Sequence, residues 1–179
     1  MPTATRAAQA KAPPEAPLDC PLCPRLFDFR TNNAKAHPDW FNAPVASFGD
    51  ASGRLLIVGL APGLQGANRT GRPFTGDYAG DLLFYSTIAK YGFSTGAYQS
   101  RPDDGLQLKD ALISNAVRCV PPENKPTGAE ILNCRQFLVS RIAAMPNLKV
   151  LLALGRIAHD STVRAVGAKP AAAVFGHGR

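Results

Sequence analysis

The sequence contains no long hydrophobic run. None of its apolar stretches approaches the roughly 20 residues that a membrane-spanning helix needs, and the N-terminus lacks the apolar core of a secretory signal. These absences argue against a membrane-embedded or exported protein, so we expect a cytoplasmic protein without membrane contacts. The 179 residues, of which 45% are hydrophobic, match the size of one domain with its own core.

The sequence also lacks both common phosphate-binding motifs. No Gly-x-Gly-x-x-Gly occurs in it. The glycine spacing of a P-loop is present between Gly66 and Gly71, but Arg72 and Pro73 stand where that motif has Lys and Ser or Thr. Pro73 has no backbone N–H to offer a phosphate. The glycine-rich stretch therefore suits another kind of ligand.

Acidic residues are outnumbered by basic ones. Thirteen Asp and Glu against twenty Lys and Arg give a formal net charge of +7 and an isoelectric point near 9.5. This balance favours an anionic partner such as nucleic acid, although basic tails produce similar values. Residues 1–16 are basic, rich in Ala and Pro, and without a repeating apolar period. We expect a disordered arm over residues 1–16 and a single domain over residues 17–179.

Three apolar runs predict the strands of a buried sheet. Residues 55–58 read Leu-Leu-Ile-Val without alternation, which is typical of a central strand covered on both faces. Similar runs occupy residues 111–117 and 149–154, and helical patterns cover residues 81–91, 127–145 and 155–167. Thr127 and Glu130 form a capping box at the start of the second of these helices. Strand and helix alternate, which predicts an α/β fold with a parallel sheet.

The segments between these elements are irregular. Residues 24–53 mix aromatic side chains with Asn, Pro and Asp, which indicates short helices and loops, and residues 93–109 are polar and rich in turn residues. Residues 59–80 hold six glycines and two prolines, a density that argues against helix and strand. We therefore expect a long loop at the carboxyl end of the first strand, where open α/β sheets bind ligands.

Three polar or aromatic residues near that loop can take part in chemistry. Phe74 can stack on a planar ligand or anchor the core. Asp77, the only carboxylate in the loop, can position water and stabilise positive charge, or cap the following helix. Asn115, near the end of the second predicted strand, carries both a hydrogen-bond donor and an acceptor for a planar ligand, or is an ordinary strand-end Asn.

The chain has only four cysteines. Cys20 and Cys23 form one close pair, and 14 residues lie between Cys119 and Cys134. A zinc ribbon normally shows two close pairs, and disulfides are uncommon in a chain without an export signal. The spacing suits an iron–sulfur cluster bound by four thiolates. The alternative is that a cysteine such as Cys134 is only a small buried apolar residue.

Several motifs together resemble the type 5 (type B) uracil-DNA glycosylases of bacteria and archaea. The resemblance covers about residues 18 to 178. It is carried by the following sequences: Gly59-Leu60-Ala61-Pro62-Gly63, Gly66-Ala67-Asn68-Arg69-Thr70-Gly71-Arg72, Phe74-Thr75-Gly76-Asp77, Asn115-Ala116-Val117-Arg118-Cys119 and Pro121-Pro122-Glu123-Asn124-Lys125-Pro126.

The resemblance implies a three-layer uracil-DNA glycosylase fold, with a central parallel four-stranded sheet flanked by helices. It implies a base excision repair enzyme that flips uracil and other deaminated bases out of DNA and hydrolyses the N-glycosidic bond. We expect a monomer that acts on nucleoid DNA. Asp77 would be the catalytic residue, and the cluster would be a 4Fe–4S cluster. The substrate-binding residues would be Gly59, Ala61, Pro62, Asn68, Phe74 and Asn115, and the cluster ligands Cys20, Cys23, Cys119 and Cys134.

Two departures from the family pattern bear on this interpretation. The strand-end sequence Gly59-Leu60-Ala61-Pro62 lacks the acidic or polar residue that related glycosylase types place there. Catalysis must therefore depend on Asp77 or on a residue in another part of the chain. Family members also continue into a further strand and a loop containing His-Pro, so the resemblance implies a C-terminally truncated chain, and His177 receives no catalytic role. The rival hypothesis is a non-catalytic iron–sulfur protein that binds DNA or a nucleobase, or an inactive fragment.

Overall fold

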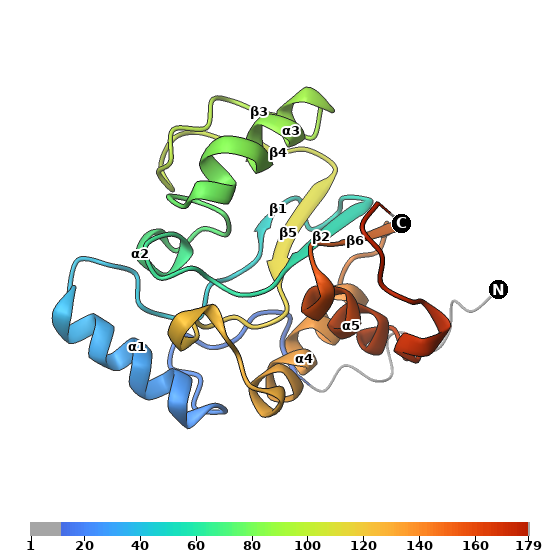
Figure 1. The fold of residues 1–179 in the computed structure, drawn as a ribbon. Helices are drawn as coiled ribbons and strands as arrows, with labels where there is room; N and C mark the ends of the chain where they lie inside the picture. Colours follow the sequence, from blue (N-terminus) through green and yellow to red (C-terminus); the bar gives the residue numbers. More distant parts are fainter. Residues whose placement is uncertain (1–11, 179) are drawn as a thin grey trace.

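A computed structural model describes residues 12–178, apart from the side chain of Leu83. The described part of the chain has three layers, with a central sheet between helices on its two faces (Figure 1). None of the helices in residues 12–178 is long and apolar enough to cross a membrane.

The central sheet has four strands in the order β1-β5-β2-β6. Strands β2 (Leu55–Gly59), β5 (Ala111–Asn115) and β6 (Val150–Ala153) are parallel, and β1 (Phe48–Gly49) pairs antiparallel with β5. The three predicted strands and their parallel pairing are confirmed, although β5 ends at Asn115 rather than at residue 117. Asn115 and Gly59 are register partners, so the two strands end side by side.

The unbroken apolar run of β2 serves both faces of the sheet. Leu56 and Val58 pack in one cluster with side chains of α4 (Gly128–Ala143) and α5 (Arg156–Ala165). Ile57 packs on the other face with Tyr85 and Ile88 of α3 (Tyr85–Lys90). Because both faces are covered, no polar position is needed in the strand, which explains the absence of alternation.

The predicted capping box is confirmed at the start of α4. The side chain of Thr127 accepts from the Glu130 backbone N–H at 3.3 Å, and the Glu130 carboxylate accepts from the Thr127 N–H at 2.7 Å. Arg25, in α1 (Pro24–Ala36), donates two hydrogen bonds to the same carboxylate, from Nε at 2.8 Å and from Nη2 at 2.7 Å. This pair fastens α1 to the start of α4.

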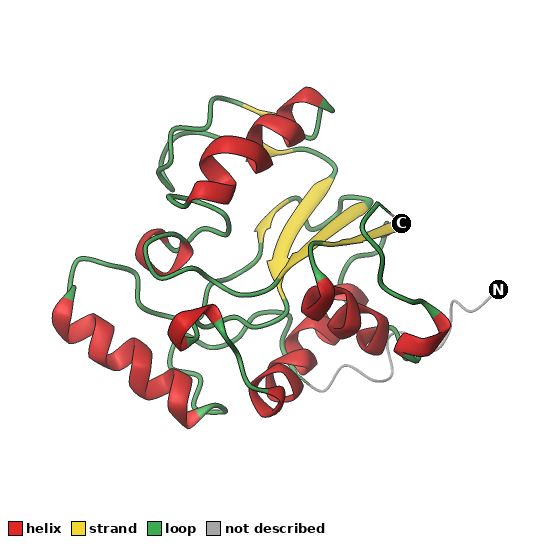
Figure 2. Ribbon diagram, in the orientation of Figure 1, coloured by secondary structure: helices red, strands yellow, loops and turns green. Residues whose placement is uncertain are grey.

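Two segments expected to be irregular contain short regular elements (Figure 2). The loop of residues 59–80 includes one helical turn, α2 (Ala67–Thr70), so the expectation of no helix there is wrong. The four consecutive residues Ala67–Thr70 contain no glycine and are enough to form one helical turn. Gly71 ends this turn in the left-handed region, at φ 77°. Residues 93–109 contain a small antiparallel pair, β3 (Ser94–Thr95) with β4 (Gln107–Leu108).

Other helical segments also differ in detail from the prediction. The helix expected over residues 81–91 begins with a π-helical turn, Gly80–Phe84, and continues as α3. Short 3-10 turns occupy Pro122–Asn124 and Pro170–Ala172. The helix expected after Gly155 is present as α5.

An arm was expected over residues 1–16, and its residues 1–11 lie outside the described part of the chain. Residues 12–16 are described, and Glu15 lies against the domain. Its carboxylate accepts from Arg118 Nη1 at 2.7 Å and from Arg141 Nε at 3.0 Å. Arg118 is only 1% exposed, so this segment supplies the counter-charge that a buried guanidinium needs.

Strand β6 forms one edge of the sheet as far as the described residues extend. Val150 and Leu152 are 54% and 44% exposed. A groove of about 290 Å³ lies between β6 and α5, lined mainly by apolar side chains and by Phe175.

Candidate active site

A narrow pocket lies where β2 and β5 end. It is lined by Ala61, Gly63, Ala67, Phe74, Asp77 and Asn115. Four of these, all except Gly63 and Ala67, were predicted from the sequence. The cavity measures about 20 Å³. The structure therefore brings the proposed stacking, reading and catalytic side chains together at the carboxyl edge of the parallel strands.

Asn115 presents an unsatisfied acceptor next to this pocket. The residue is 3% exposed, and its Oδ1 has no hydrogen-bond partner among the described residues. A buried acceptor without a partner costs about 1–3 kcal/mol. A Cβ atom at Gly59 would lie 2.5 Å from this oxygen, so only glycine allows β2 to pass it. The arrangement suits a ligand that donates a hydrogen bond to Asn115.

The position of Phe74 is compatible with both roles that the sequence left open. Its ring stacks on Phe84 with centroids 4.3 Å apart, and it packs against the core cluster around Tyr85. It also lines the pocket, where its Cζ would lie 2.7 Å from a Cβ at Gly59. Its φ of 52° is unusual for a residue with a side chain, which indicates that the surrounding structure holds this backbone in place.

Asp77 likewise has one oxygen for each of its two possible roles. Its Oδ1 accepts from the Gly80 N–H at 2.8 Å, which is the capping contact of the helical segment that follows. Its Oδ2 lies near Gly63 and Gly66, since Cβ atoms there would be 3.7 and 2.6 Å away. The cap fixes the direction of the carboxylate while its second oxygen adjoins the pocket.

Three of the predicted substrate-binding residues do not line the pocket: Gly59, which lies beside Asn115 Oδ1, Pro62 and Asn68. Pro62 is buried within the loop of residues 59–80. Asn68 is 1% exposed and donates through Nδ2 to Asn42 Oδ1 at 3.0 Å, so it fastens residues 40–42 to α2. The roles of these three residues in binding substrate remain predictions.

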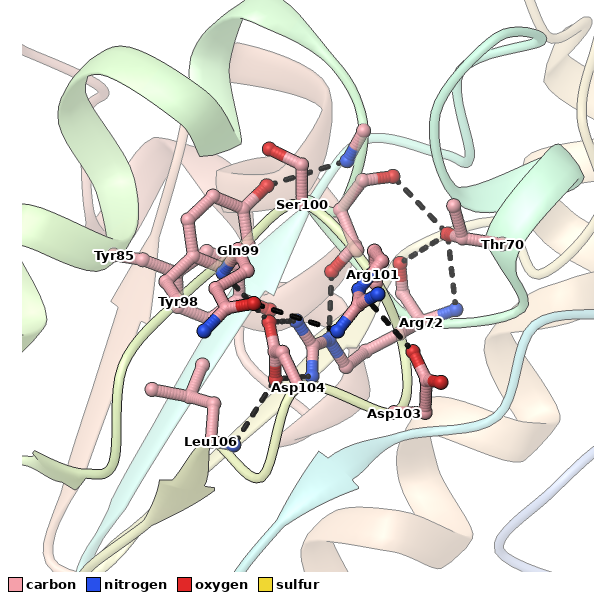
Figure 3. A network of polar contacts seen from close by, with 12 residues as sticks. Thr70, Arg72, Tyr85, Tyr98, Gln99, Ser100, Arg101, Asp103, Asp104 and Leu106 are labelled. Atoms are coloured by element: carbon pink, nitrogen blue, oxygen red, sulfur yellow. Dashed lines mark hydrogen bonds and ion pairs between the residues drawn. The ribbon is translucent and has the colours of Figure 1, made fainter.

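A buried ion pair holds the loop that carries Phe74 (Figure 3). Arg72 contacts Asp104 through two hydrogen bonds of 2.8 and 2.7 Å, and both side chains are almost fully buried. The hydrogen bonds from Arg72, with further help from the backbone N–H groups of Gln99 and Leu106, hold the pKa of Asp104 well below its usual range. The pair joins residues 70–77 to residues 99–106.

Two tyrosines complete this network (Figure 3). Tyr85 donates to the Pro73 carbonyl at 2.6 Å, and burial raises the pKa of its hydroxyl. Tyr98 donates to Asp81 Oδ1 at 2.5 Å and accepts from the Gly76 N–H at 3.2 Å. The backbone on both sides of Phe74 is therefore fixed. Sequence reasoning missed this network, because its partners are separated by up to 32 residues and show no periodic pattern.

The four cysteines line one pocket on the side of α1 and α4. Cys20 and Cys23 precede α1, Cys119 follows β5, and Cys134 lies on α4. None of these four cysteines forms a disulfide bond. Three polar groups contact the sulfur atoms: Arg30 Nη1 donates to Cys119 at 3.3 Å, the Arg118 N–H to Cys134 at 3.2 Å, and Asn133 Nδ2 to Cys23 at 3.8 Å.

The chemistry of this donor set fits an iron–sulfur cluster. Burial raises the pKa of Cys119 to about 11 and of Cys134 to about 12, so these thiols need added positive charge to become thiolates. In residues 12–178, no three His, Cys, Asp or Glu side chains are grouped to hold one metal ion. A four-iron cluster binds each thiolate through a different iron, so its ligands need not converge on one point.

Fold and site together define an α/β protein with a ligand pocket at the carboxyl ends of parallel strands. A model of the uracil DNA glycosylase superfamily matches residues 46–176, and the chain belongs to that superfamily. It is 41% identical over 165 residues to the type-5 uracil-DNA glycosylase of Thermus thermophilus, covering 89% of this chain and 74% of the relative. The type-5 enzyme of Pyrobaculum aerophilum is 36% identical, with coverage of 90% and 71%.

A more distant relative is the type-4 uracil-DNA glycosylase of Thermotoga maritima. It is 34% identical over 115 residues, which are 64% of this chain and 51% of the relative. The similarity therefore extends over more of the chain in the type-5 enzymes, and the predicted resemblance to type 5 is confirmed.

Proposed function

We propose that this protein is a DNA repair glycosylase that removes uracil, and other deaminated bases, from DNA. The observation that carries the proposal is the unpaired Oδ1 of Asn115, buried beside Phe74 and Asp77. The names of the type-5 relatives support the same activity. We expect the protein to act as a monomer on nucleoid DNA in the cytoplasm.

Recognition follows from the hydrogen-bonding groups of uracil. Uracil carries an N3–H donor beside its O4 acceptor, which complements the Oδ1 and Nδ2 atoms of an asparagine amide. Cytosine has an unprotonated N3 and an amino group at the same positions, so the same amide orientation meets it with mismatched groups. Phe74 stacks on the face of the flipped base.

Bond cleavage requires stabilisation of charge on the sugar. The electron pair of the C1′–N1 bond leaves with the base, and positive charge develops on the deoxyribose ring. The Asp77 carboxylate stabilises this charge and positions a water molecule. The water oxygen bonds to C1′, its proton passes to the departing base, and the products are neutral uracil and an abasic site.

We further propose that Cys20, Cys23, Cys119 and Cys134 hold a 4Fe–4S cluster. The cluster would supply a covalent connection between the start of α1, the segment after β5 and the middle of α4. The hydrogen bonds of Arg30 and Arg118 to the sulfur atoms would offset the negative charge of the thiolates. The role is structural, and base removal uses the residues of the other pocket.

Release of free uracil from single- and double-stranded oligonucleotides tests the proposal. We expect release by the wild-type protein and a marked loss in Asn115→Ala. The matched control is Asn147→Ala, because Asn147 is exposed and makes only a surface contact with the Ser52 carbonyl. Binding of uracil-containing DNA without release of uracil would favour the non-catalytic alternative.

A further inference from the structure

A second, wider hollow lies on the other side of α2 from the active-site pocket. It measures about 430 Å³ and is lined by Trp40, Phe41, Arg69, Thr70 and residues 100–102, with Asp39 at one end. We refer to it as the Trp40 groove. The pocket and the groove share α2: Ala67 lines the pocket, whereas Arg69 and Thr70 line the groove.

One wall of the Trp40 groove is fastened directly to α2. The backbone N–H groups of Phe41 and Asn42 donate to the carbonyls of Arg69 and Asn68, both at 3.0 Å. The ring of Phe41 lies against Gly71, where a Cβ would be 2.9 Å from it. The position of Trp40 is therefore linked to the loop that holds Phe74 and Asp77.

The opposite wall is held by the Arg72–Asp104 pair (Figure 3). Asp104 accepts from the Gln99 N–H at 2.9 Å, and Ser100 Oγ donates to Asp81 Oδ1 at 2.6 Å. Both walls thus meet the active-site loop through specific hydrogen bonds. A chain bound in the groove would be held in a defined position relative to the pocket.

The groove offers a flat aromatic surface together with guanidinium groups. Trp40 stacks on His37 with ring centroids 3.9 Å apart. Arg69 donates to the Gln65 carbonyl at 2.8 Å and forms no close ion pair with a carboxylate of the described residues, although its charge helps to lower the pKa of Asp81. Arg101 is 60% exposed, and its contact with Asp103 is long, at 3.6 Å. Such an exposed ion pair is worth little and leaves the guanidinium free to bind another anion.

We propose that the Trp40 groove binds the DNA strand that carries the target nucleotide. Backbone phosphates lie at Arg69 and Arg101, and a base next to the flipped nucleotide stacks on Trp40. Aromatic surfaces combined with basic side chains are the usual means of binding single-stranded nucleic acid without reading its sequence. The inference rests on the proposed function, because it assumes that the pocket takes a nucleotide of the same strand.

The chain has a single tryptophan, so intrinsic fluorescence reports on this groove alone. Titration with an undamaged single-stranded oligonucleotide should quench Trp40 and give the same Kd as anisotropy of the labelled DNA. Arg101→Glu should weaken binding about tenfold and lower the salt dependence of log K by about 0.7. The matched control is Lys149→Glu, which makes the same charge change at an exposed side chain just before β6, at the opposite edge of the parallel strands from the pocket.

Trp40→Ala should weaken binding of the same oligonucleotide about tenfold, whereas Trp40→Phe should retain most of the affinity. These losses should be the same for uracil-containing and undamaged DNA, and they should appear in the Kd more than in the maximal single-turnover rate. Circular dichroism checks that each variant is folded.

Three outcomes would overturn the proposal: DNA binding without quenching of Trp40, equal losses in Arg101→Glu and Lys149→Glu, or full affinity in Trp40→Ala. The binding titrations require no catalysis. A wild-type protein that binds DNA through the groove but releases no uracil would therefore contradict the proposed function and leave the groove assignment intact.

Discussion

The two sites near the end of β5 are built in opposite ways. Asn115 ends the strand at the polar pocket, and Cys119, four residues later, lies in the thiol pocket. Hydrogen bonds between loops hold the polar pocket, with Arg72 and Asp104 at the centre. Buried thiols with raised pKa values line the other pocket, together with apolar side chains such as Leu26 and Phe137.

This difference indicates separate tasks for the two sites. The polar pocket has an unpaired acceptor, Asn115 Oδ1, and the Asp77 carboxylate, which suit a ligand that binds reversibly. In the thiol pocket, burial raises the pKa of Cys119 and Cys134, so a bound group of positive charge would favour their thiolate forms. Changes in the thiol pocket should therefore affect folding first, and changes in the polar pocket should affect base removal first.

The largest expected effect is that of Cys119→Ala. The wild-type protein, purified without oxygen, should contain about four irons per chain. Loss of one ligand should remove the iron and most of the folded yield, because the binding energy of a structural metal site is part of the folding energy. Iron content and thermal unfolding measure both effects.

Ser140→Ala is the control for this variant, since Ser140 is a buried residue of α4 whose Oγ has no partner among the described residues. It should keep both iron and fold. Stoichiometric zinc in place of iron, or a fully folded Cys119→Ala protein, would contradict the assignment of the thiol pocket.

Asp104→Asn should lower the free energy of unfolding by about 3–5 kcal/mol, because it leaves the buried Arg72 guanidinium without its counter-charge. Glu123→Gln breaks the exposed pair with Lys125 and should cost at most about 1 kcal/mol. Denaturant unfolding at neutral pH compares the two. Similar losses would show that the Arg72–Asp104 pair does not stabilise the loop.

The Asp104 carboxylate should make the free energy of unfolding depend on pH in the acidic range. The folded-state pKa of Asp104 is lowered, so its contribution is present above the unfolded pKa of about 3.9 and is lost as pH falls toward the folded value. Wild-type stability should fall more steeply than that of Asp104→Asn below about pH 4. If the free energies of unfolding of the wild type and of Asp104→Asn fall equally with pH, Asp104 is not the cause of the acid dependence.

Asp77→Asn should slow single-turnover base release roughly a hundredfold while DNA affinity changes little, because charge stabilisation acts mainly in the transition state. The amide keeps an oxygen that can cap Gly80, so the fold should persist. Asp160→Asn on α5 provides the control for loss of a carboxylate. A wild-type rate in Asp77→Asn would leave Asp77 with only its capping role.

The smallest of these effects is expected at the glycine that separates the two strand ends. Gly59→Ala should lower stability by about 1–3 kcal/mol and reduce turnover, since its Cβ would press on Asn115 Oδ1 and the Phe74 ring. Gly128→Ala has open space around its Cβ and should be neutral or slightly stabilising. Equal behaviour of the two variants would show that the loop adapts to the added methyl group.

Much of the fold could be predicted because its signals are local. The apolar run in residues 55–58 and the capping box at Thr127 each specify an element through neighbouring residues, and both are confirmed. The loop with Phe74 and Asp77 was placed correctly because glycine excludes long regular elements. The single turn of α2 was missed because four residues give too short a pattern to recognise.

The sequence by itself determined the α/β class, the position of the loop and four of the six residues that line the pocket. Only the tertiary structure decided which of the predicted residues point inward: Asn115 does, whereas Asn68 bonds to Asn42. It also decided the pairing of Arg72 with Asp104 and of Arg118 with Glu15. A buried guanidinium requires an acidic partner, but any Asp or Glu that the fold brings near can serve. The spacing of residues in the sequence therefore does not predict which acidic residue pairs with which arginine.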